Sequence, residues 1–282
     1  MPSKKIIKRR IISVKSTKQI IKAMDMVATS KLQKIKARLA AARPLFEESN
    51  RIINVLKSCE ETSENIFVKP REVKNVAYVV ISSNRGLCGS YNISISQKTL
   101  SHIDEKANEH ILAIGTRGRD YLRRRGKNIL HLYKDVAETA FYTDAEDIGM
   151  RLIELYTSGK TDEVYVAYTR FDSVMSYTPC VQKVLPIGDG SHPAHRSDAM
   201  QYEPNAEAFL NHMIPTYLSS FIYGAMLESN SCEQASRMIS MNSATKNASE
   251  IIDDLTLLYN RKRQADITQE INEIVSGASV SK

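Results

Sequence analysis

Three short stretches of the sequence contain residue types that could do chemistry, but the first two lack a part that nucleotide binding needs. A phosphate-binding loop requires GxxxxGK[ST], and Gly159-Lys160-Thr161 supplies only its end, because Glu154 stands where the first glycine belongs. The turn NRGLCG, residues 84–89, follows an apolar run but does not fit the dinucleotide pattern GxGxxG. We therefore predict that no nucleotide cofactor is bound.

The third stretch contains two histidines that are three residues apart. His192 and His195 lie in a loop-like sequence and lack the neighbouring carboxylate of an HExxH site, so metal binding is the weaker interpretation. Cys88 lies between two glycines, where a small buried thiol is a commoner role than a nucleophile. No nucleophile–base pair can be defended, and we predict no catalytic residue, no cofactor and no metal.

These stretches belong to a middle region, residues 75–190, in which strands and helices alternate. Nine of the eleven glycines fall between Gly86 and Gly190. Apolar runs predict strands at Val76–Ser82, His110–Ile114, Glu163–Arg170 and Thr178–Leu185. Helices are expected at Asn92–Asn108 with Asn92 as N-cap, at Arg117–Arg125 and at Thr143–Ser158. The alternation predicts a small α/β domain with a largely parallel sheet that ends in a hairpin.

The two ends of the chain show helical periodicity instead, over residues 1–59 and 204–282. Apolar or small residues recur every three or four positions and form a seam, the stripe typical of a coiled coil. In the first helix the seam is Ile7, Ile11, Val14, Ile21, Met24, Ala28, Ile35, Leu39, Ala42, Phe46 and Ile53. In the last it is Ile214, Tyr217, Phe221, Ala225, Cys232, Ala235, Ile239, Ala244, Ala248, Ile251, Leu255, Leu258, Ala265, Ile271 and Ile274.

The last helix, Asn205 to about Ser276, would be roughly 100 Å long at 1.5 Å per residue. Pro44 should end or kink the first helix, with a second helical segment from Leu45 to Cys59. One part of the C-terminal seam is polar, with Ser236, Ser240, Asn242 and Ser243. This part either loosens the helix pair or marks where other subunits cover it.

Charge favours antiparallel pairing of the two terminal helices. Residues 1–57 contain 15 Lys/Arg against 3 Asp/Glu, whereas residues 203–276 contain 5 against 10. The basic first helix could bind nucleic acid, but it has no interleaved aromatic residues, and neither a helix-turn-helix nor a zinc spacing follows. A solvated face, or a face offered to an acidic protein, is the better interpretation.

Composition sets further bounds. Hydrophobic residues make up 42% of the 282, which is enough for a sizeable core. The longest strongly apolar run, Val76–Ile81, is far too short to span a bilayer. The four cysteines, Cys59, Cys88, Cys180 and Cys232, show no CxxC and no paired spacing, so a reduced, cytosol-facing protein is the simplest interpretation.

Beyond these patterns, the chain resembles the γ subunit of F-type ATP synthases of bacterial type from Lys5 to Val280. The resemblance rests on IKRRIISVKSTKQIIKAMDMVATSKL near the start, on VVISSN with RGLCG, on the YEP triplet at 202–204, and on the run from Glu233 to Ala278. It is strongest at the two ends of the chain.

The resemblance implies a central rotor, non-catalytic by itself. Its terminal helices would form an antiparallel coiled coil inside a ring of three α and three β subunits. Its Rossmann-like α/β domain would stand on the membrane c-ring beside the ε subunit. The resemblance further implies a peripheral location at the cytoplasmic face of the bacterial inner membrane, with membrane contact only through the c-ring.

The resemblance also assigns roles to single residues. Arg263, Gln264 and Thr268 match family positions that touch a catch loop of a β subunit, and we call these three the catch residues. Further β contacts are implied for Met24, Cys88 and Glu273. Tyr202 and Glu203 would face the c-ring and ε.

Two other classes of function stay open at this point. A nucleic-acid-binding coiled coil would show salt-dependent DNA binding and no affinity for α and β subunits. A small α/β enzyme with a helical oligomerisation arm would bind a nucleotide saturably. The rotor interpretation predicts neither property.

Overall fold

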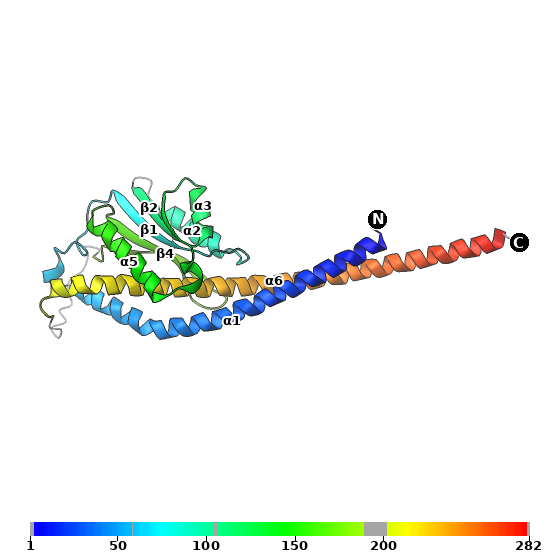
Figure 1. The fold of residues 1–282 in the computed structure, drawn as a ribbon, viewed down its shortest axis with the longest axis horizontal. Coiled ribbons are helices and arrows are strands. Elements are labelled where there is room, and N and C mark those ends of the chain that lie inside the picture. The colour runs from blue at the N-terminus through cyan, green and yellow to red at the C-terminus, as the bar shows by residue number, and fades with distance from the viewer. Residues whose placement is uncertain (1–2, 58, 104–106, 189–201, 281–282) are drawn as a thin grey trace. The chain divides into compact units, whose positions relative to one another are not determined.

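The structure is a computed structural model that describes residues 3–57, 59–103, 107–188 and 202–280. The chain forms two compact units: Met1–Ala28 with Met238–Lys282, and Thr29–Arg237. We call them the paired-helix unit and the α/β unit. Two long helices, α1 (Lys4–Leu56) and α6 (Ala206–Val280), contribute residues to both units (Figure 1).

The α/β unit contains a five-stranded sheet in the order β3-β2-β1-β4-β5. Its strands are β1 (Asn75–Ile81), β2 (Asn108–Ile114), β3 (Ile129–Tyr133), β4 (Glu163–Phe171) and β5 (Tyr177–Leu185). The pairs β1–β2, β1–β4 and β2–β3 are parallel, whereas β4 and β5 form an antiparallel hairpin. The predicted fold class, with its largely parallel sheet and terminal hairpin, is therefore confirmed.

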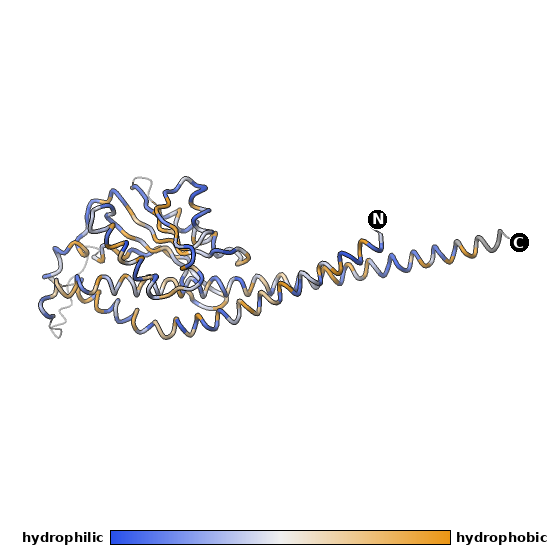
Figure 2. Tube along the Cα trace, viewed as in Figure 1, coloured by the Kyte–Doolittle hydropathy of each residue, from blue (hydrophilic) through white to orange (hydrophobic). Residues whose placement is uncertain are grey.

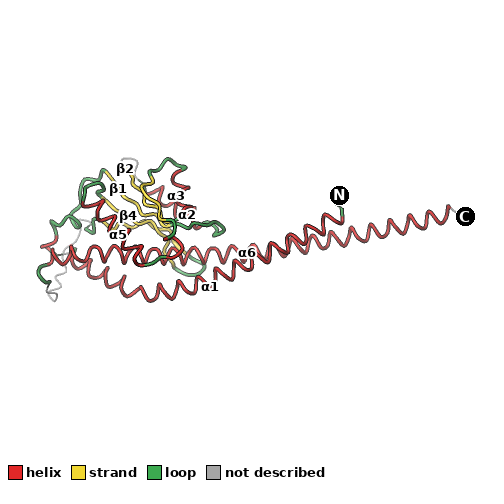
Figure 3. The backbone as a smooth tube through the Cα atoms, in the orientation of Figure 1, coloured by secondary structure: helices red, strands yellow, loops and turns green. Residues whose placement is uncertain are grey.

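Side chains alternate across this sheet because successive residues of a strand point to opposite faces. On one face Val76, Tyr78 and Val80 pack with helices α2 (Tyr91–His102) and α3 (Thr116–Arg123). On the other face Ala77, Val79 and Ile81 belong to a larger core. That core contains α5 (Tyr142–Thr157) and the parts of α1 and α6 that belong to this unit. Figure 2 shows the strands as largely hydrophobic, and Figure 3 shows helices on both sides of them.

Some predicted elements differ from those observed. Strand β3 and the short helix α4 (Val136–Thr139) were not predicted, and a 3-10 turn (Glu60–Thr62) lies between the regions predicted as the first helix and the α/β domain. Helix α2 begins at Tyr91 and ends at His102, so the prediction that Asn92 caps a helix reaching Asn108 is wrong. Ser90 occupies the N-cap position instead.

Pro44 does not end α1, which continues as one α-helix from Lys4 to Leu56. Pro44 itself is exposed, whereas Ile35 and Ile53 on either side of it are buried in the core of the α/β unit. Packing on both sides therefore holds the helix together across a residue that donates no backbone hydrogen bond. In this part of the α/β unit α1 is curved, as a helix with a solvent-facing proline can be (Figure 1).

In the paired-helix unit the seam predicted for α1 is the protected side of the helix. Ile7 and Ala28 are buried, whereas off-seam residues such as Ile12 and Ile20 are 59% exposed. On α6, Met241 and Ala248 are buried, but the later seam residues Ile251, Leu258, Ile271 and Ile274 are exposed. The α1 part of this unit, Lys4–Ala28, has 25 residues and the α6 part, Met238–Val280, has 43, and both rise by about 1.5 Å per residue. The shorter helix cannot cover the longer one, so the end of α6 has an uncovered apolar side.

Among the described residues no helix is both long enough and apolar enough to cross a membrane.

Candidate functional site

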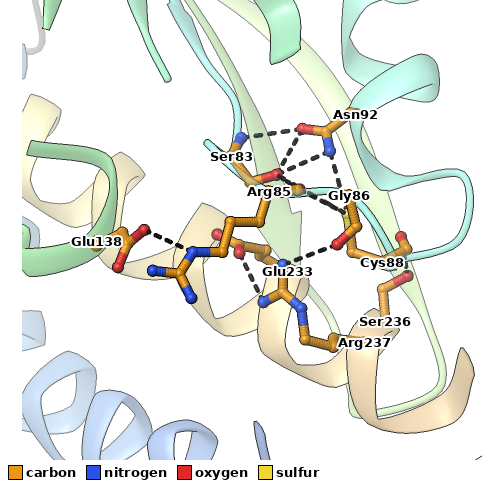
Figure 4. Close-up of polar contacts among 9 residues, drawn as sticks. All are labelled: Ser83, Arg85, Gly86, Cys88, Asn92, Glu138, Glu233, Ser236 and Arg237. Atoms are coloured by element: carbon orange, nitrogen blue, oxygen red, sulfur yellow. Dashed lines mark hydrogen bonds and ion pairs between the residues drawn. The ribbon is translucent and has the colours of Figure 1, made fainter. Parts of the chain in front are cut away.

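The turn between β1 and α2 is held in one shape by its own side chains. The backbone N–H of Ser83 donates to Asn92 Oδ1 at 2.9 Å, and Asn92 Nδ2 donates to Cys88 Sγ at 3.1 Å (Figure 4). Leu87 and Gly89 adopt positive φ values of 64° and 54°, which the tight turn requires. Asn92 is therefore used to brace the turn, and this tertiary contact explains why it does not cap α2.

The braced turn is docked on α6. Ser236 Oγ donates to the carbonyl of Cys88 at 2.6 Å, and Arg237 Nη2 donates to the carbonyl of Gly86 at 3.4 Å. Arg237 also pairs with Glu233 one helical turn earlier, at 2.7 Å, and both of these side chains are only 10% exposed. On the other side of the turn, exposed Arg85 pairs with Glu138 of α4 at 3.3 Å (Figure 4).

A second set of contacts fixes α6 to the end of β4. The backbone N–H of Thr169 donates to Ser229 Oγ at 3.1 Å, and that of Phe171 donates to Glu228 Oε2 at 3.2 Å. The thiol of Cys232 donates to the carbonyl of Thr169 at 3.4 Å. We call these contacts of Glu228–Arg237 with the ends of β1 and β4 the joint.

The joint occupies the place where open α/β sheets usually bind ligands. In such sheets the binding crevice lies at the carboxyl ends of the strands, where the strand order switches direction. In this sheet the switch lies between β1 and β4, and residues from α6 form hydrogen bonds with the chain at the carboxyl ends of both strands. The α/β unit therefore uses this crevice to hold a helix.

Burial governs the ionisable groups of the joint. Desolvation raises the pKa of Glu233, and the Arg237 guanidinium opposes this shift. Burial likewise raises the pKa of the Cys88 and Cys232 thiols, so both are poor nucleophiles. Cys88 is 2% exposed, which confirms the prediction of a small buried thiol, and all four cysteines are free.

Sequence reasoning did not identify Glu233, Ser236 and Arg237 as a site. Two signals could have found it: the Glu–Arg pair at i, i+4, and the polar residue Ser236 in the seam. From the sequence alone, the polar residues in this part of the seam indicate either loosening of the helix pair or cover by other subunits. At Ser236 the cover comes from the chain's own turn, where the carbonyl oxygen of Cys88 accepts a hydrogen bond from the Ser236 hydroxyl.

The other stretches of chemical interest have structural surroundings of a different kind. Gly159, with φ of 71°, and Lys160 follow the end of α5, where the Lys160 N–H donates back to the carbonyl of Leu155. This is a helix C-terminus, and not the strand-to-helix turn that holds phosphate. His192 and His195 lie outside the described residues. Within the described ranges no group of three or more His, Cys, Asp or Glu could hold a metal ion.

The three catch residues lie on one stretch of α6 in the paired-helix unit. Arg263, Gln264 and Thr268 are all exposed, and Thr268 Oγ1 donates to the carbonyl of Gln264 at 2.9 Å. No residue in the described part of the chain forms an ion pair with Arg263, whereas its neighbour Lys262 pairs with Asp266 at 3.0 Å. The Arg263 guanidinium is thus available to a partner.

The other residues that the resemblance assigns to partner contacts do not lie together in one place. Met24 is half-buried in the paired-helix unit, and the side chain of Glu273 lies outside what the structure describes. Tyr202 is half-buried in the α/β unit, with its ring 5.6 Å from that of Phe209, and Glu203 is exposed. Cys88 is buried in the joint, so a partner reaching this turn would meet its exposed neighbour Leu87.

Comparison with known proteins gives consistent matches over the whole chain. The family model described as ATP synthase matches residues 3–280. An ATP synthase gamma chain from Alkaliphilus metalliredigens is 43% identical over 282 residues, with 98% of each chain covered. A sodium-ion-specific ATP synthase gamma chain from Acetobacterium woodii is 40% identical, with 96% of each chain covered.

Solved structures agree with this. A chain from the central stalk and c-ring of the Tetrahymena thermophila mitochondrial ATP synthase is 25% identical with a TM-score of 0.60. The match covers 80% of this chain and 99% of that one. A chain from the Euglena gracilis mitochondrial ATP synthase has a TM-score of 0.72, covering 98% of this chain and 94% of that one. At 16% identity the second likeness shows the fold alone.

Proposed function

Because the chain belongs to the ATP synthase gamma chain family, we propose that it is the central rotor shaft of an F1Fo ATP synthase. In this role it carries no catalytic residue. It couples rotation of an ion-driven c-ring to conformational change in catalytic β subunits. Its partners are the ring of three α and three β subunits, the ε subunit and the c-ring, and it reaches the membrane only through the c-ring. Its place is then peripheral, at the cytoplasmic face of a bacterial inner membrane.

The observation that carries this proposal is the joint. A shaft that transmits torque needs its base fixed to its long helix, so that the two turn as one body. Five hydrogen bonds between α6 and the turn or β4, together with a buried ion pair within α6, fix the sheet to this helix. An enzyme would use the same crevice for a substrate, so the joint favours a mechanical role over a catalytic one.

The coupling itself is a shift of populations. A helix pair that presents different side chains at each angle binds one conformation of a β subunit better than the others, and so favours that conformation. By linkage, the nucleotide bound in a β subunit must in turn favour particular rotor angles. Ion flow can therefore drive ATP synthesis, and ATP hydrolysis can drive rotation in the opposite sense.

The catch residues are the contacts that form and break during this cycle. The exposed donors Arg263 and Gln264 suit a reversible hold on an acidic β loop, because charged pairs in water are individually weak. Met24, the turn around Cys88, and Glu273 supply further β contacts. Tyr202 and Glu203 face the c-ring and ε.

Reconstitution with matching α and β subunits tests the proposal. We expect a defined complex with one copy of this chain and ATPase activity. Arg263→Ala, Gln264→Ala and Thr268→Ala should each lower turnover severalfold, which corresponds to an activation free energy raised by roughly 1 kcal/mol. Assembly of the complex should persist in all three variants. Lys262→Ala is the matched control, because its charge is paired with Asp266. If no complex forms, the rotor assignment fails; if turnover is unchanged, only the position of the catch is wrong.

A further inference from the structure

A cavity of about 420 Å³ opens within the α/β unit, between α1, α6 and the end of β4. In this stretch α1 curves away from α6, as the light-blue and yellow-orange helices show in Figure 1. The volume lies in the range of small-molecule sites, roughly 300–1,000 Å³. The cavity is not part of the joint, although Glu228 touches both.

The wall of the cavity is mainly apolar and aromatic. Five rings contribute to it, from Phe46, Tyr168, Phe171, Phe221 and Tyr223. The Phe46 and Phe221 rings are 5.6 Å apart, and the Tyr168 and Phe221 rings 6.0 Å apart. Such a wall binds a flat apolar group, and the ring faces also attract a positive charge.

Most of the charged residues at the cavity already have partners. Arg43 pairs with Glu47 at 3.0 Å, and Lys36 Nζ lies 5.8 Å from the centre of the Phe171 ring. Asp172 accepts hydrogen bonds from Thr178 Oγ1 at 2.7 Å and from Arg170 Nε at 3.1 Å.

Glu228 differs from these residues. Its carboxylate accepts a backbone N–H from Phe171, but no cation in the described part of the chain forms an ion pair with it. Burial raises the pKa of Glu228, and the hydrogen bond from Phe171 and the charges of Arg170 and Arg43 oppose this shift only in part. A positive charge placed in the cavity, directly against Glu228, would therefore stabilise the ionised carboxylate further.

We propose that this cavity binds a small molecule with a flat apolar body and a cationic amine, the body against the aromatic wall and the amine against Glu228. The combination of five rings with one unpaired half-buried carboxylate selects a cation over a neutral or anionic molecule of the same shape. This site is independent of the rotor role.

Two probes of equal size test the proposal on the full chain. Naphthalen-1-ylmethylamine carries the amine, and naphthalen-1-ylmethanol replaces it with a neutral hydroxyl. By calorimetric titration we expect one saturable site for the amine, roughly tenfold tighter than for the alcohol, as a charge-assisted hydrogen bond provides. Saturating amine should also raise the unfolding temperature.

Matched variants locate the site. Glu228→Gln keeps the acceptor for Phe171 and should abolish the preference for the amine, whereas Glu47→Gln, at the exposed rim, should keep it. Ala42→Phe fills the cavity and should remove binding of both probes, with circular dichroism as the check on folding. Equal binding of both probes, or an amine preference that survives Glu228→Gln, would overturn the proposal. Loss of binding on adding α and β subunits would overturn it too, because the cavity would then be a docking surface.

Discussion

Glu233 and Arg237 form an ion pair whose value depends on both residues being present. Each side chain is only 10% exposed, so removal of either would leave the other as a buried charge without its counter-ion. A buried ion pair of this kind adds little to the free energy of unfolding compared with an apolar pair of similar size. Removing one partner is strongly destabilising, because the other charge remains buried without its counter-ion. The pair therefore makes docking of the turn specific, since the Arg237 guanidinium also reaches the carbonyl of Gly86.

Replacing Arg237→Ala should accordingly destabilise the α/β unit by about 3 kcal/mol. The measurement is urea unfolding of the full chain, followed by circular dichroism. Arg85→Ala is the matched control, because Arg85 is 77% exposed in its pair with Glu138. An exposed pair of this type contributes less than about 1 kcal/mol. Equal effects of the two substitutions would show that the buried pair is not important for docking.

For single residues, the sequence predicted that Cys88 is a buried thiol in a turn, but it did not predict which residues surround it. A thiol between two glycines was expected to be buried in a turn, and it is. Asn92 was expected to cap a helix, because Asn is a common cap and stands next to the start of an amphipathic segment. Its side chain instead meets Ser83 and Cys88. The residues next to Asn92 do not show that its side chain will bind the turn, because its partners Ser83 and Cys88 lie nine and four residues earlier in the chain.

Among the glycine positions that the structure describes, the turn from β2 into α3 has the closest backbone approach. Gly115 has φ of 89°, and a Cβ on it would lie 2.2 Å from the carbonyl oxygen of Ser82 at the end of β1. Only glycine fits, because both the backbone conformation and the space exclude a side chain. This close approach lets α3 begin directly beside the neighbouring parallel strand.

Gly115→Ala should therefore destabilise the chain by more than about 3 kcal/mol, combining strain at positive φ with a backbone clash. Gly126→Ala isolates the first of these effects, because Gly126 has φ of 75° and no atom lies within 4 Å of the position that a Cβ would take. It should cost only about 1 kcal/mol. Thermal unfolding of the two variants, compared with the parent chain, measures the difference. Similar losses would mean that the approach to Ser82 is not what requires glycine.

The elements were predicted where their pattern was strong. β1 is a continuous apolar run and is buried almost throughout, so its sequence alone identifies it. β3 was missed because it is an edge strand with partly exposed residues and the sequence ILHLY, which has no clean alternation. The prediction that α1 ends at Pro44 is wrong for a related reason. Proline disfavours the helix interior, but the packing of Ile35 and Ile53 in the core outweighs this local cost.

At the scale of the whole molecule, the two units differ in how much of α6 is buried by the rest of the chain. In the α/β unit α6 is buried along most of Ile214–Arg237, whereas in the paired-helix unit the seam residues Ile251, Leu258, Ile271 and Ile274 are exposed. Exposed apolar side chains in a row indicate a surface meant to be covered by a partner. The rotor assignment supplies that partner as the ring of α and β subunits.

Hydrogen exchange can test this difference. In the full chain alone, amides of residues 251–280 should exchange much faster than those of residues 214–237, because few buried contacts oppose local opening. After assembly with α and β subunits the fast amides should become protected. Residues 214–237 serve as the internal reference. Fast exchange that persists in the complex would mean that the exposed seam is not what the partners cover.

The central claim is that this chain turns inside its partners, and rotation can be observed directly. The α and β subunits would be fixed to a surface and a bead attached through Met175→Cys, because Met175 is 86% exposed and a thiol there is open to a reagent. On addition of ATP we expect the bead to turn continuously in one direction, with three equal pauses in each turn, one for each β subunit. A complex that hydrolyses ATP while the bead stays still, or moves without direction, would contradict the account.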